Sequence, residues 1–335
     1  MTLVLGASEI RAVIGAVDVV EAVESIHRDL GSGAMSQPAP GALAGADDAV
    51  FLPMAVQSDR LGLVAVKLMA DIPANGDRGL PTQRSTILVS SSITGECVAV
   101  LDGMAITRAR TAATSVVATR RLARADSSTL GLIGLGNLAI EHARRFAAVR
   151  PFDRIVVWSR SSATVDRFLR EVGPDLPDRC IIASSPKEVA KESDVICTLT
   201  PSIDPILHGA WLHAGQHINA VGARPRATHR ELDGEAMARS TVFVDSRATA
   251  QTKSGDLLVA LAEGTLSPDV ELTELGEVIA GQSRGRSGID EITVFDSVGL
   301  GAQDLAVAAQ VIDLAREHGV GNTAQLSATP TVVIS

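Results

Sequence analysis

Two cationic residues stand where they would be useful for chemistry. Lys67 interrupts the apolar stretch of residues 61–69, which otherwise has the composition of a β-strand. Burying an ammonium group there is costly unless an anion compensates it, and a substrate carboxylate would do so. Arg110 opens the sequence RTAATS on a helix of small residues, where its guanidinium could bind a carboxylate or phosphate. The local pattern also allows an edge-strand lysine that reaches water and an arginine on a helix surface.

A glycine-rich turn lies in the middle of the chain. An apolar strand, the turn GLGNLA at residues 134–139, an amphipathic helix and a second apolar strand ending at Trp158 follow one another. Gly134 permits the tight turn, Gly136 lets the backbone approach a pyrophosphate, and Ala139 lets the helix pack close to the strand. The helix N-terminus then offers N–H groups to the phosphates. The pattern predicts a dinucleotide-binding βαβ unit, and the alternative is a glycine turn in an unliganded α/β domain.

The end of the second strand bears on the choice of cofactor. A carboxylate there would bind the ribose 2′-hydroxyl of NAD, but the chain has Ser159 and Arg160 instead. A hydroxyl and a guanidinium suit a 2′-phosphate, which favours NADP over NAD. Arginine can also stack on the adenine of NAD, so both cofactors stay open.

Further polar residues follow the later strands of the pattern. Thr200 and Gly222 come directly after apolar strands, at the edge where open α/β sheets bind ligands. Three arginines, Arg224, Arg226 and Arg230, lie just beyond, and such a cluster indicates an acidic substrate group. The alternative is a basic loop on the surface of an acidic protein.

These residues must be positioned by two domains, which a length of 335 residues allows. Strands dominate residues 49–100, and alternating strands and helices follow from the glycine turn onward. A helix over Ala302–His318 carries an apolar stripe and should pack back on the first domain. We therefore predict an α/β protein: a Rossmann dinucleotide-binding domain over residues 121–302, and a discontinuous α+β domain over 1–120 and 303–335.

Composition excludes several other classes. The net charge of −9 disfavours a nucleic-acid partner or an anionic membrane surface. No apolar run approaches the roughly 20 residues that span a bilayer, and the N-terminus lacks the features of a signal peptide. Cys97, Cys180 and Cys197 have no metal-binding spacing, so we expect buried thiols, no metal and a cytoplasmic location.

Several separate stretches resemble the ornithine cyclodeaminase/mu-crystallin family, in family order and spacing. The matching segments are Leu63–Lys67 with Gly79–Thr82, Arg110–Ser115, Gly134–Ala139, Asn219–Gly222 and Phe295–Gly299. The resemblance implies a homodimer that binds a small imino or amino acid and NAD(P)H. It implies that the discontinuous domain binds substrate and dimerises.

The resemblance also assigns roles to residues. It implies that Lys67 contacts the substrate and acts in proton transfer, that Arg110 lies between the substrate carboxylate and the cofactor, and that Val298 closes on the substrate. From these patterns and the resemblance together, the residues predicted along the cofactor are Thr82, Arg110, Gly134, Leu135, Gly136, Asn137, Leu138, Ser159, Arg160, Thr200, Ala220, Val221, Gly222, Ala223 and Ser297.

Two departures from the family pattern affect the expected activity. Arg224 stands where ornithine cyclodeaminases have a catalytic aspartate, and Pro40 stands where the family has an arginine. The loss of the carboxylate argues against cyclisation of ornithine. An arginine in the same cleft would repel a distal ammonium group and attract a distal carboxylate.

We therefore predict an NAD(P)H-dependent reductase of an α-imino acid, equivalently an amino-acid dehydrogenase. Lys67 and Arg110 are the candidate catalytic residues, and Arg224 is the candidate ligand of a second acidic group. That assignment suggests a dicarboxylic imine such as iminosuccinate, which would give aspartate, with cyclic ketimines next. The alternatives are a cyclodeaminase-type ammonia lyase and a non-catalytic cofactor-binding protein.

Overall fold

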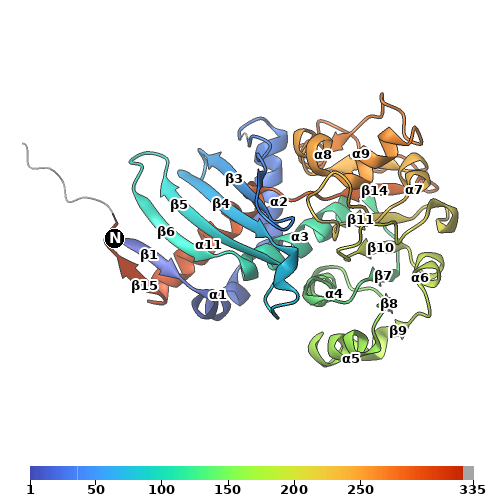
Figure 1. The fold of residues 1–335 in the computed structure, drawn as a ribbon, viewed down its shortest axis with the longest axis horizontal. Helices are drawn as coiled ribbons and strands as arrows, with labels where there is room; N and C mark the ends of the chain where they lie inside the picture. The colour runs from blue at the N-terminus through green and yellow to red at the C-terminus, as the bar shows by residue number, and fades with distance from the viewer. Residues whose placement is uncertain (36, 327–335) are drawn as a thin grey trace, which may run out of the picture. The chain divides into compact units, whose positions relative to one another are not determined.

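The chain builds two β-sheets, each in its own compact unit. The computed structural model describes residues 1–35 and 37–326. One unit comprises Met1–Arg110 together with the segment from Leu300 onward, and the other comprises Thr111–Gly299. We call them the discontinuous unit and the central unit (Figure 1).

The sheet of the discontinuous unit has seven strands within the described residues, in the order β15-β1-β6-β5-β4-β3-β2. Its neighbouring strands run antiparallel except for β1 and β6. The strands are β1 (Thr2–Leu5), β2 (Leu43–Ala44), β3 (Val50–Ser58), β4 (Leu63–Asp71), β5 (Gln83–Ser91), β6 (Cys97–Asp102) and β15 (Asn322–Ala324).

One helix from the far end of the chain completes this unit. The helix α11 (Gly301–Glu317) packs against β3 and β4 and against α1 (Ala7–Val13) and α2 (Val19–Gly31). Its position agrees with the predicted return of a C-terminal helix to the first domain. The Asp18 side chain caps α2 by accepting a hydrogen bond from the Glu21 N–H. The helix α3 (Met104–Leu122) follows β6 and continues into the central unit.

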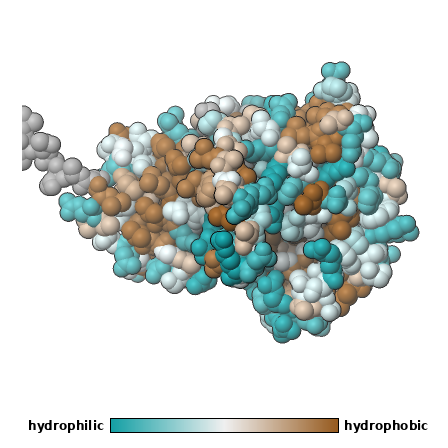
Figure 2. All heavy atoms as spheres, in the orientation of Figure 1, coloured by the Kyte–Doolittle hydropathy of each residue, from teal (hydrophilic) through white to brown (hydrophobic). Residues whose placement is uncertain are grey.

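The strand β4 reverses the usual placement of polar and apolar side chains. Lys67 lies on its covered face and is 2% exposed, whereas Leu68 lies on the opposite face and is 46% exposed. Because β4 pairs with both β3 and β5, it is an interior strand, so the edge-strand interpretation of Lys67 is wrong. Figure 2 shows apolar residues gathered on the open face of this sheet.

The central unit has a parallel sheet of eight strands within the described residues, in the order β13-β12-β14-β11-β10-β7-β8-β9. The strands are β7 (Thr129–Ile133), β8 (Arg154–Trp158), β9 (Cys180–Ile182), β10 (Val195–Thr198), β11 (His217–Ala220), β12 (Thr241–Val244), β13 (Thr273–Glu274) and β14 (Thr293–Asp296). The chain proceeds from β7 outward to β8 and β9, then returns to β10 on the other side of β7. The strand order therefore reverses beside β7, which is where such sheets bind dinucleotides. The predicted α/β fold is confirmed.

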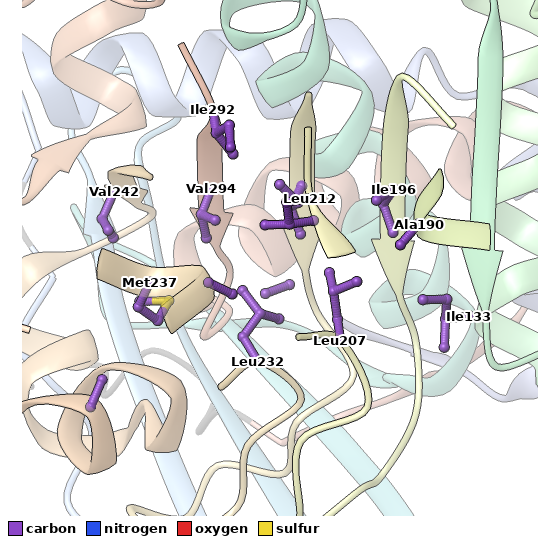
Figure 3. Packing of buried hydrophobic residues seen from close by; sticks show 14 of the residues in the cluster. Ile133, Ala190, Ile196, Leu207, Leu212, Leu232, Met237, Val242, Ile292 and Val294 are labelled. Carbon is purple, nitrogen blue, oxygen red and sulfur yellow. The ribbon is translucent and has the colours of Figure 1, made fainter. Parts of the chain in front are cut away.

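Helices cover the central sheet and enclose its apolar core (Figure 3). They are α4 (Asn137–Val149), α5 (Ser162–Glu171), α6 (Pro186–Glu192), α7 (Gly234–Ala238), α8 (Arg247–Lys253), α9 (Gly255–Ala262) and α10 (Leu275–Ile279). The core residues in Figure 3 include Ile133 from β7, Ile196 from β10 and Val294 from β14. A methyl group on Gly131 would lie 2.7 Å from Val189 Cγ1, so a glycine there allows α6 to rest directly on β7.

The remaining helical segments are short. Turns of 3₁₀ type lie at Ile14–Ala16, Pro73–Asn75, Pro177–Arg179 and Gly209–Trp211. Among the described residues, none of the helices combines the length and the apolar character that a membrane span requires.

Candidate active site

Lys67 points into the discontinuous unit and meets a carboxylate that the sequence patterns did not identify. Its Nζ lies 3.0 Å from both Oδ atoms of Asp304 and 2.8 Å from Thr107 Oγ1. Lys67 and Asp304 are 2% and 1% exposed, so water does not screen this ion pair. The strand β4 supplies the cation and the first turn of α11 supplies the anion.

Arg110 joins the same carboxylate from α3. Its Nε donates to Asp304 Oδ1 at 3.2 Å, and its Nη1 donates to Gln303 Oε1 at 2.8 Å. The guanidinium is buried, so the interpretation as a helix-surface arginine is wrong. The structure thus brings the two predicted catalytic residues together through Asp304. We call Lys67, Thr107, Arg110, Gln303 and Asp304 the lysine cluster.

A histidine lies behind the lysine cluster. The Gln303 amide nitrogen lies 3.0 Å from His27 Nε2, while its carbonyl oxygen accepts from Arg110. Because the amide nitrogen is a donor, His27 Nε2 must be the unprotonated acceptor. Burial lowers the pKa of His27 to about 4, and the nearby Arg110 charge acts in the same direction. A neutral His27 therefore fixes the orientation of the amide that holds Arg110.

Burial also brings the pKa of Lys67 close to neutral pH. It lowers the pKa of Lys67 to about 8, an effect that Asp304 opposes and Arg110 reinforces. An ammonium group with that pKa is protonated at neutral pH yet gives up its proton far more readily than a surface lysine. The lysine cluster can therefore bind an anion and supply a proton.

In the central unit, the glycine turn after β7 has the geometry that a dinucleotide requires. Gly134 has a φ of +92°, and a methyl group on it would lie 2.6 Å from Thr200 Cγ2. A methyl group on Gly136 would meet nothing within 4 Å, so the space over this backbone is open. Gly136 also precedes α4 without a side-chain cap. The open N-terminus of α4 fits a pyrophosphate. Of the other predicted residues in this turn, Leu135 is buried, Leu138 is half-buried and Asn137 is exposed.

The turns after β10 and β11 lie beside this one. Ala220 ends β11, and Val221, Gly222 and Ala223 follow it half-buried. The backbone N–H groups of Thr200 and Gly222 both donate to the Glu231 carboxylate, at 2.6 and 2.7 Å. The predicted cofactor residues of both turns are therefore tied to one buried acid.

A cavity of about 530 Å³ opens beside the end of β8. Ser159 and Arg160 line it together with Ser162 and Asp166 of α5 and with Ile182 of β9. The two residues predicted to select the cofactor thus share one cavity. Its lining joins a guanidinium, hydroxyl groups and the Asp166 carboxylate to apolar surface.

The segment after β14 is held by another carboxylate. Asp245 accepts hydrogen bonds from the backbone N–H groups of Val298 and Gly299, at 3.2 and 2.7 Å, and from Ser297 Oγ at 3.3 Å. Ser297 and Val298 are half-buried. Thr82, predicted to lie along the cofactor, belongs to the discontinuous unit, where its carbonyl accepts from the Ile72 N–H at 2.8 Å.

One of the three arginines of the predicted cluster is engaged elsewhere. Arg230 turns away and makes a two-fold ion pair with Glu263, at 2.9 and 2.8 Å. Arg224 lies half-buried in the turn after β11, and no ion pair to it is found within residues 1–35 and 37–326. The anion-binding candidate is therefore reduced to the part of the loop that contains Arg224.

Sequence patterns missed Asp304, Gln303, Glu231 and Asp245. A signal for the first two was present, because Gln303 and Asp304 interrupt the apolar helix GAQDLAVAAQVIDL in its first turn. Asp245 also carries a signal, because it directly follows the apolar strand β12, whereas Glu231 lies in ordinary loop sequence. No group of histidines, cysteines and carboxylates arranged to hold a metal occurs in the described part of the chain.

Fold and site together define an NAD(P)-dependent oxidoreductase with a Rossmann unit. The chain belongs to the ornithine cyclodeaminase/mu-crystallin family, whose model matches residues 1–319. The family predicted from the sequence is therefore confirmed.

Three solved structures of the family are similar over nearly the whole chain. The Δ1-pyrroline-2-carboxylate reductase of Thermococcus litoralis, in complex with NADH and L-proline, has a TM-score of 0.92 and 31% identity, covering 96% of this chain and 100% of that one. An archaeal alanine dehydrogenase dimer with bound NAD has a TM-score of 0.89 and 31% identity, covering 97% and 99%. The iminosuccinate reductase of Paracoccus denitrificans with NAD⁺ has a TM-score of 0.85 and 28% identity, covering 96% and 98%.

Proposed function

We propose that this protein is an NAD(P)H-dependent reductase of an α-imino acid that carries a second carboxylate. The observation that carries the proposal is the buried lysine cluster, which combines a proton donor of lowered pKa with a guanidinium. The similarity to a pyrroline-2-carboxylate reductase and an iminosuccinate reductase supports reduction of a C=N group.

The central unit fits the nicotinamide cofactor. The open backbone at Gly136 and the uncapped N-terminus of α4 would hold the pyrophosphate, and the cavity beside Arg160 would hold the adenosine. Because Ser159 and Arg160 replace the carboxylate that would bind a ribose hydroxyl, we propose a preference for NADPH. The bound cofactor would supply the hydride that reduces the imine carbon.

The residues of the lysine cluster would serve the rest of the reaction. Arg110 would bind the α-carboxylate through its planar guanidinium. Lys67 would donate the proton that the imine nitrogen needs as its carbon is reduced, and Asp304 would keep the lysine oriented and ready to be reprotonated. The burial of both cations excludes the water that would hydrolyse an imine.

Arg224 is the proposed determinant of substrate class. It lies in a turn at the carboxyl edge of the parallel sheet, half-buried and without an ion pair in the described residues. A guanidinium in that state is available to a second, distal carboxylate. Iminosuccinate, whose reduction gives aspartate, has that group, and a cyclic imine of a monocarboxylic acid does not.

We also propose a homodimer that forms through the open face of the first sheet. Paired positions on four neighbouring strands form one apolar row across this face: Val4, Val100, Leu88 and Val66. Leu68 lies on the same face of β4, two residues from Val66, and such an exposed patch is typical of an interface between copies of one chain. The archaeal alanine dehydrogenase, described as a dimer, supports this assignment.

The test follows oxidation of NADH and NADPH by absorbance, with ammonia and either oxaloacetate, pyruvate or 2-oxoglutarate, and with cyclic imines in parallel. We expect turnover with oxaloacetate and ammonia, at a KM that rises at least tenfold in Arg224→Ala while turnover of pyruvate is unchanged. The exposed arginine of α5 provides the matched control, Arg170→Ala, which should change neither. Release of ammonia from ornithine without net oxidation of cofactor would overturn the proposal in favour of a cyclodeaminase.

A further inference from the structure

A single buried carboxylate joins two turns at the carboxyl edge of the central sheet. Glu231 Oε1 accepts from both the backbone N–H and the hydroxyl of Thr200, each at 2.6 Å, and Oε2 accepts from the Gly222 N–H at 2.7 Å. Thr200 follows β10 and Gly222 follows β11. The side chain that connects them is fully buried.

These two turns also determine the position of the glycine turn after β7. A methyl group on Gly222 would lie 2.2 Å from the Thr200 nitrogen, and one on Gly134 would lie 2.6 Å from Thr200 Cγ2. The three turns therefore touch one another with no space to spare. A change in the Glu231 contacts would move Thr200, and Thr200 would move the turn that faces the pyrophosphate.

We propose that Glu231 is a positioning residue for the cofactor, and that its ionised carboxylate holds the turns after β7, β10 and β11 in the arrangement that binds the dinucleotide. This inference rests on the proposal that the central unit binds NAD(P)H. Glu231 itself touches neither substrate nor cofactor, and acts through Thr200 and Gly222.

Protonation would weaken this arrangement. Each carboxylate oxygen accepts from a backbone N–H, which cannot act as an acceptor, and protonation replaces these charge-assisted hydrogen bonds by weaker neutral ones. Burial raises the pKa of Glu231 to about 7, and the nearby Asp256 adds to the effect, while the Thr200 hydrogen bonds oppose it. The other titratable groups near it are Asp256, which accepts from the Glu231 N–H, and Asp296 and Cys197. Cofactor affinity should therefore fall as the pH drops below about 7.

The test measures the Kd of NADH by fluorescence at several pH values between 6 and 8.5, with wild type and Glu231→Gln. NADH is the probe because it lacks the phosphomonoester of NADPH, whose own pKa of about 6 would confuse the profile. We expect the wild type to bind more weakly as the pH falls. Glu231→Gln should bind about tenfold more weakly at pH 8.5, the effect of losing one hydrogen bond, and its affinity should change less with pH than that of the wild type. The exposed carboxylate Glu263 provides the control variant, Glu263→Gln, which should behave like wild type.

A Glu231→Gln protein with the affinity and pH profile of wild type would overturn the proposal. If Glu231→Gln does not fold, the same measurement of NADH affinity is made with Glu231→Asp. Its shorter carboxylate should bind NADH more weakly but keep the pH dependence, and wild-type affinity in Glu231→Asp would overturn the proposal equally. A wild-type protein that binds neither NADH nor NADPH would instead refute the proposed function on which this inference rests.

Discussion

Replacing Asp304 by asparagine removes the anion from the lysine cluster with almost no change in shape. With a pKa of about 8, Lys67 is favoured in its charged form at pH 7 by roughly 1 kcal/mol. Loss of the Asp304 charge can therefore destabilise the folded variant by no more than that amount through Lys67. Beyond that limit, Lys67 becomes neutral in the folded state. The weakened charge-assisted hydrogen bond from Arg110 adds about 1.5–3 kcal/mol. We expect Asp304→Asn to lower the free energy of unfolding by about 3–4 kcal/mol at pH 7.

The pH dependence gives this prediction a distinctive signature. In the variant, Lys67 is neutral when folded and protonated when unfolded up to about pH 10.5, so stability rises with pH from below pH 7. In the wild type, Lys67 contributes such a rise only above about pH 8. The deficit of the variant should therefore shrink between pH 7 and pH 8 and stay constant above it.

Urea denaturation at pH 7, 8 and 9 measures both quantities, and NAD(P)H oxidation measures the activity. Asp313 is exposed on the same helix, so Asp313→Asn is the matched control and should stay within about 0.5 kcal/mol of wild type. Since a neutral Lys67 has no proton to give, kcat of Asp304→Asn should fall at least about a hundredfold. The reasoning would be refuted if Asp304→Asn were as stable as the control. It would also be refuted if the difference in unfolding free energy between Asp304→Asn and the wild type did not change from pH 7 to pH 8.

Three other perturbations test separate features. Burial lowers the pKa of His142 to about 4, so between about pH 4 and 6.5 this residue is neutral in the folded state but charged in the unfolded state. Acidification from pH 6.5 to 4 should therefore destabilise the wild type by up to about 3 kcal/mol more than it destabilises His142→Gln. Urea denaturation measures the difference. Leu68→Glu should convert the dimer to a monomer in light scattering, whereas Ile93→Glu, at an exposed hairpin position, should not; a monomeric wild type would contradict the proposed interface. Arg160→Ala should raise KM for NADPH at least tenfold and leave KM for NADH within about twofold, and equal effects on both would argue against a 2′-phosphate contact.

The sequence allowed the central unit to be predicted because its signals are local. The turn at Gly134, the helix after it and the apolar strand before it are contiguous in the chain, from Thr129 to Val149, and each has its own physical requirement. Lys67 could be singled out for the same reason, since a lysine among apolar neighbours is conspicuous. Its choice of face was not predictable, because the neighbours on both faces of β4 are apolar.

The partners of the predicted residues were harder to find because they lie far away in the chain. Asp304 is 237 residues from Lys67, and no local pattern encodes that pairing. Arg230 was assigned to a cluster with its sequence neighbours, but Glu263, 33 residues later, binds it instead. The tertiary fold determines which side chains meet, so the sequence could suggest individual site residues but not the hydrogen-bonded network that joins them.

The separation between Lys67 and Asp304 has a consequence for how the protein is made. At about 5–20 residues per second, a ribosome needs roughly 12–47 s to add the 237 residues that separate the lysine from its counter-ion. During that time α11, which covers β3 and β4, does not exist, and β1 lacks its neighbour β15. The central unit is formed by one continuous stretch of chain, so it can fold before the N-terminal strands have their C-terminal partners. We therefore expect the last segment of the chain to close the discontinuous unit, and a chain stopped before Gly301 to leave those strands exposed to aggregation and proteolysis.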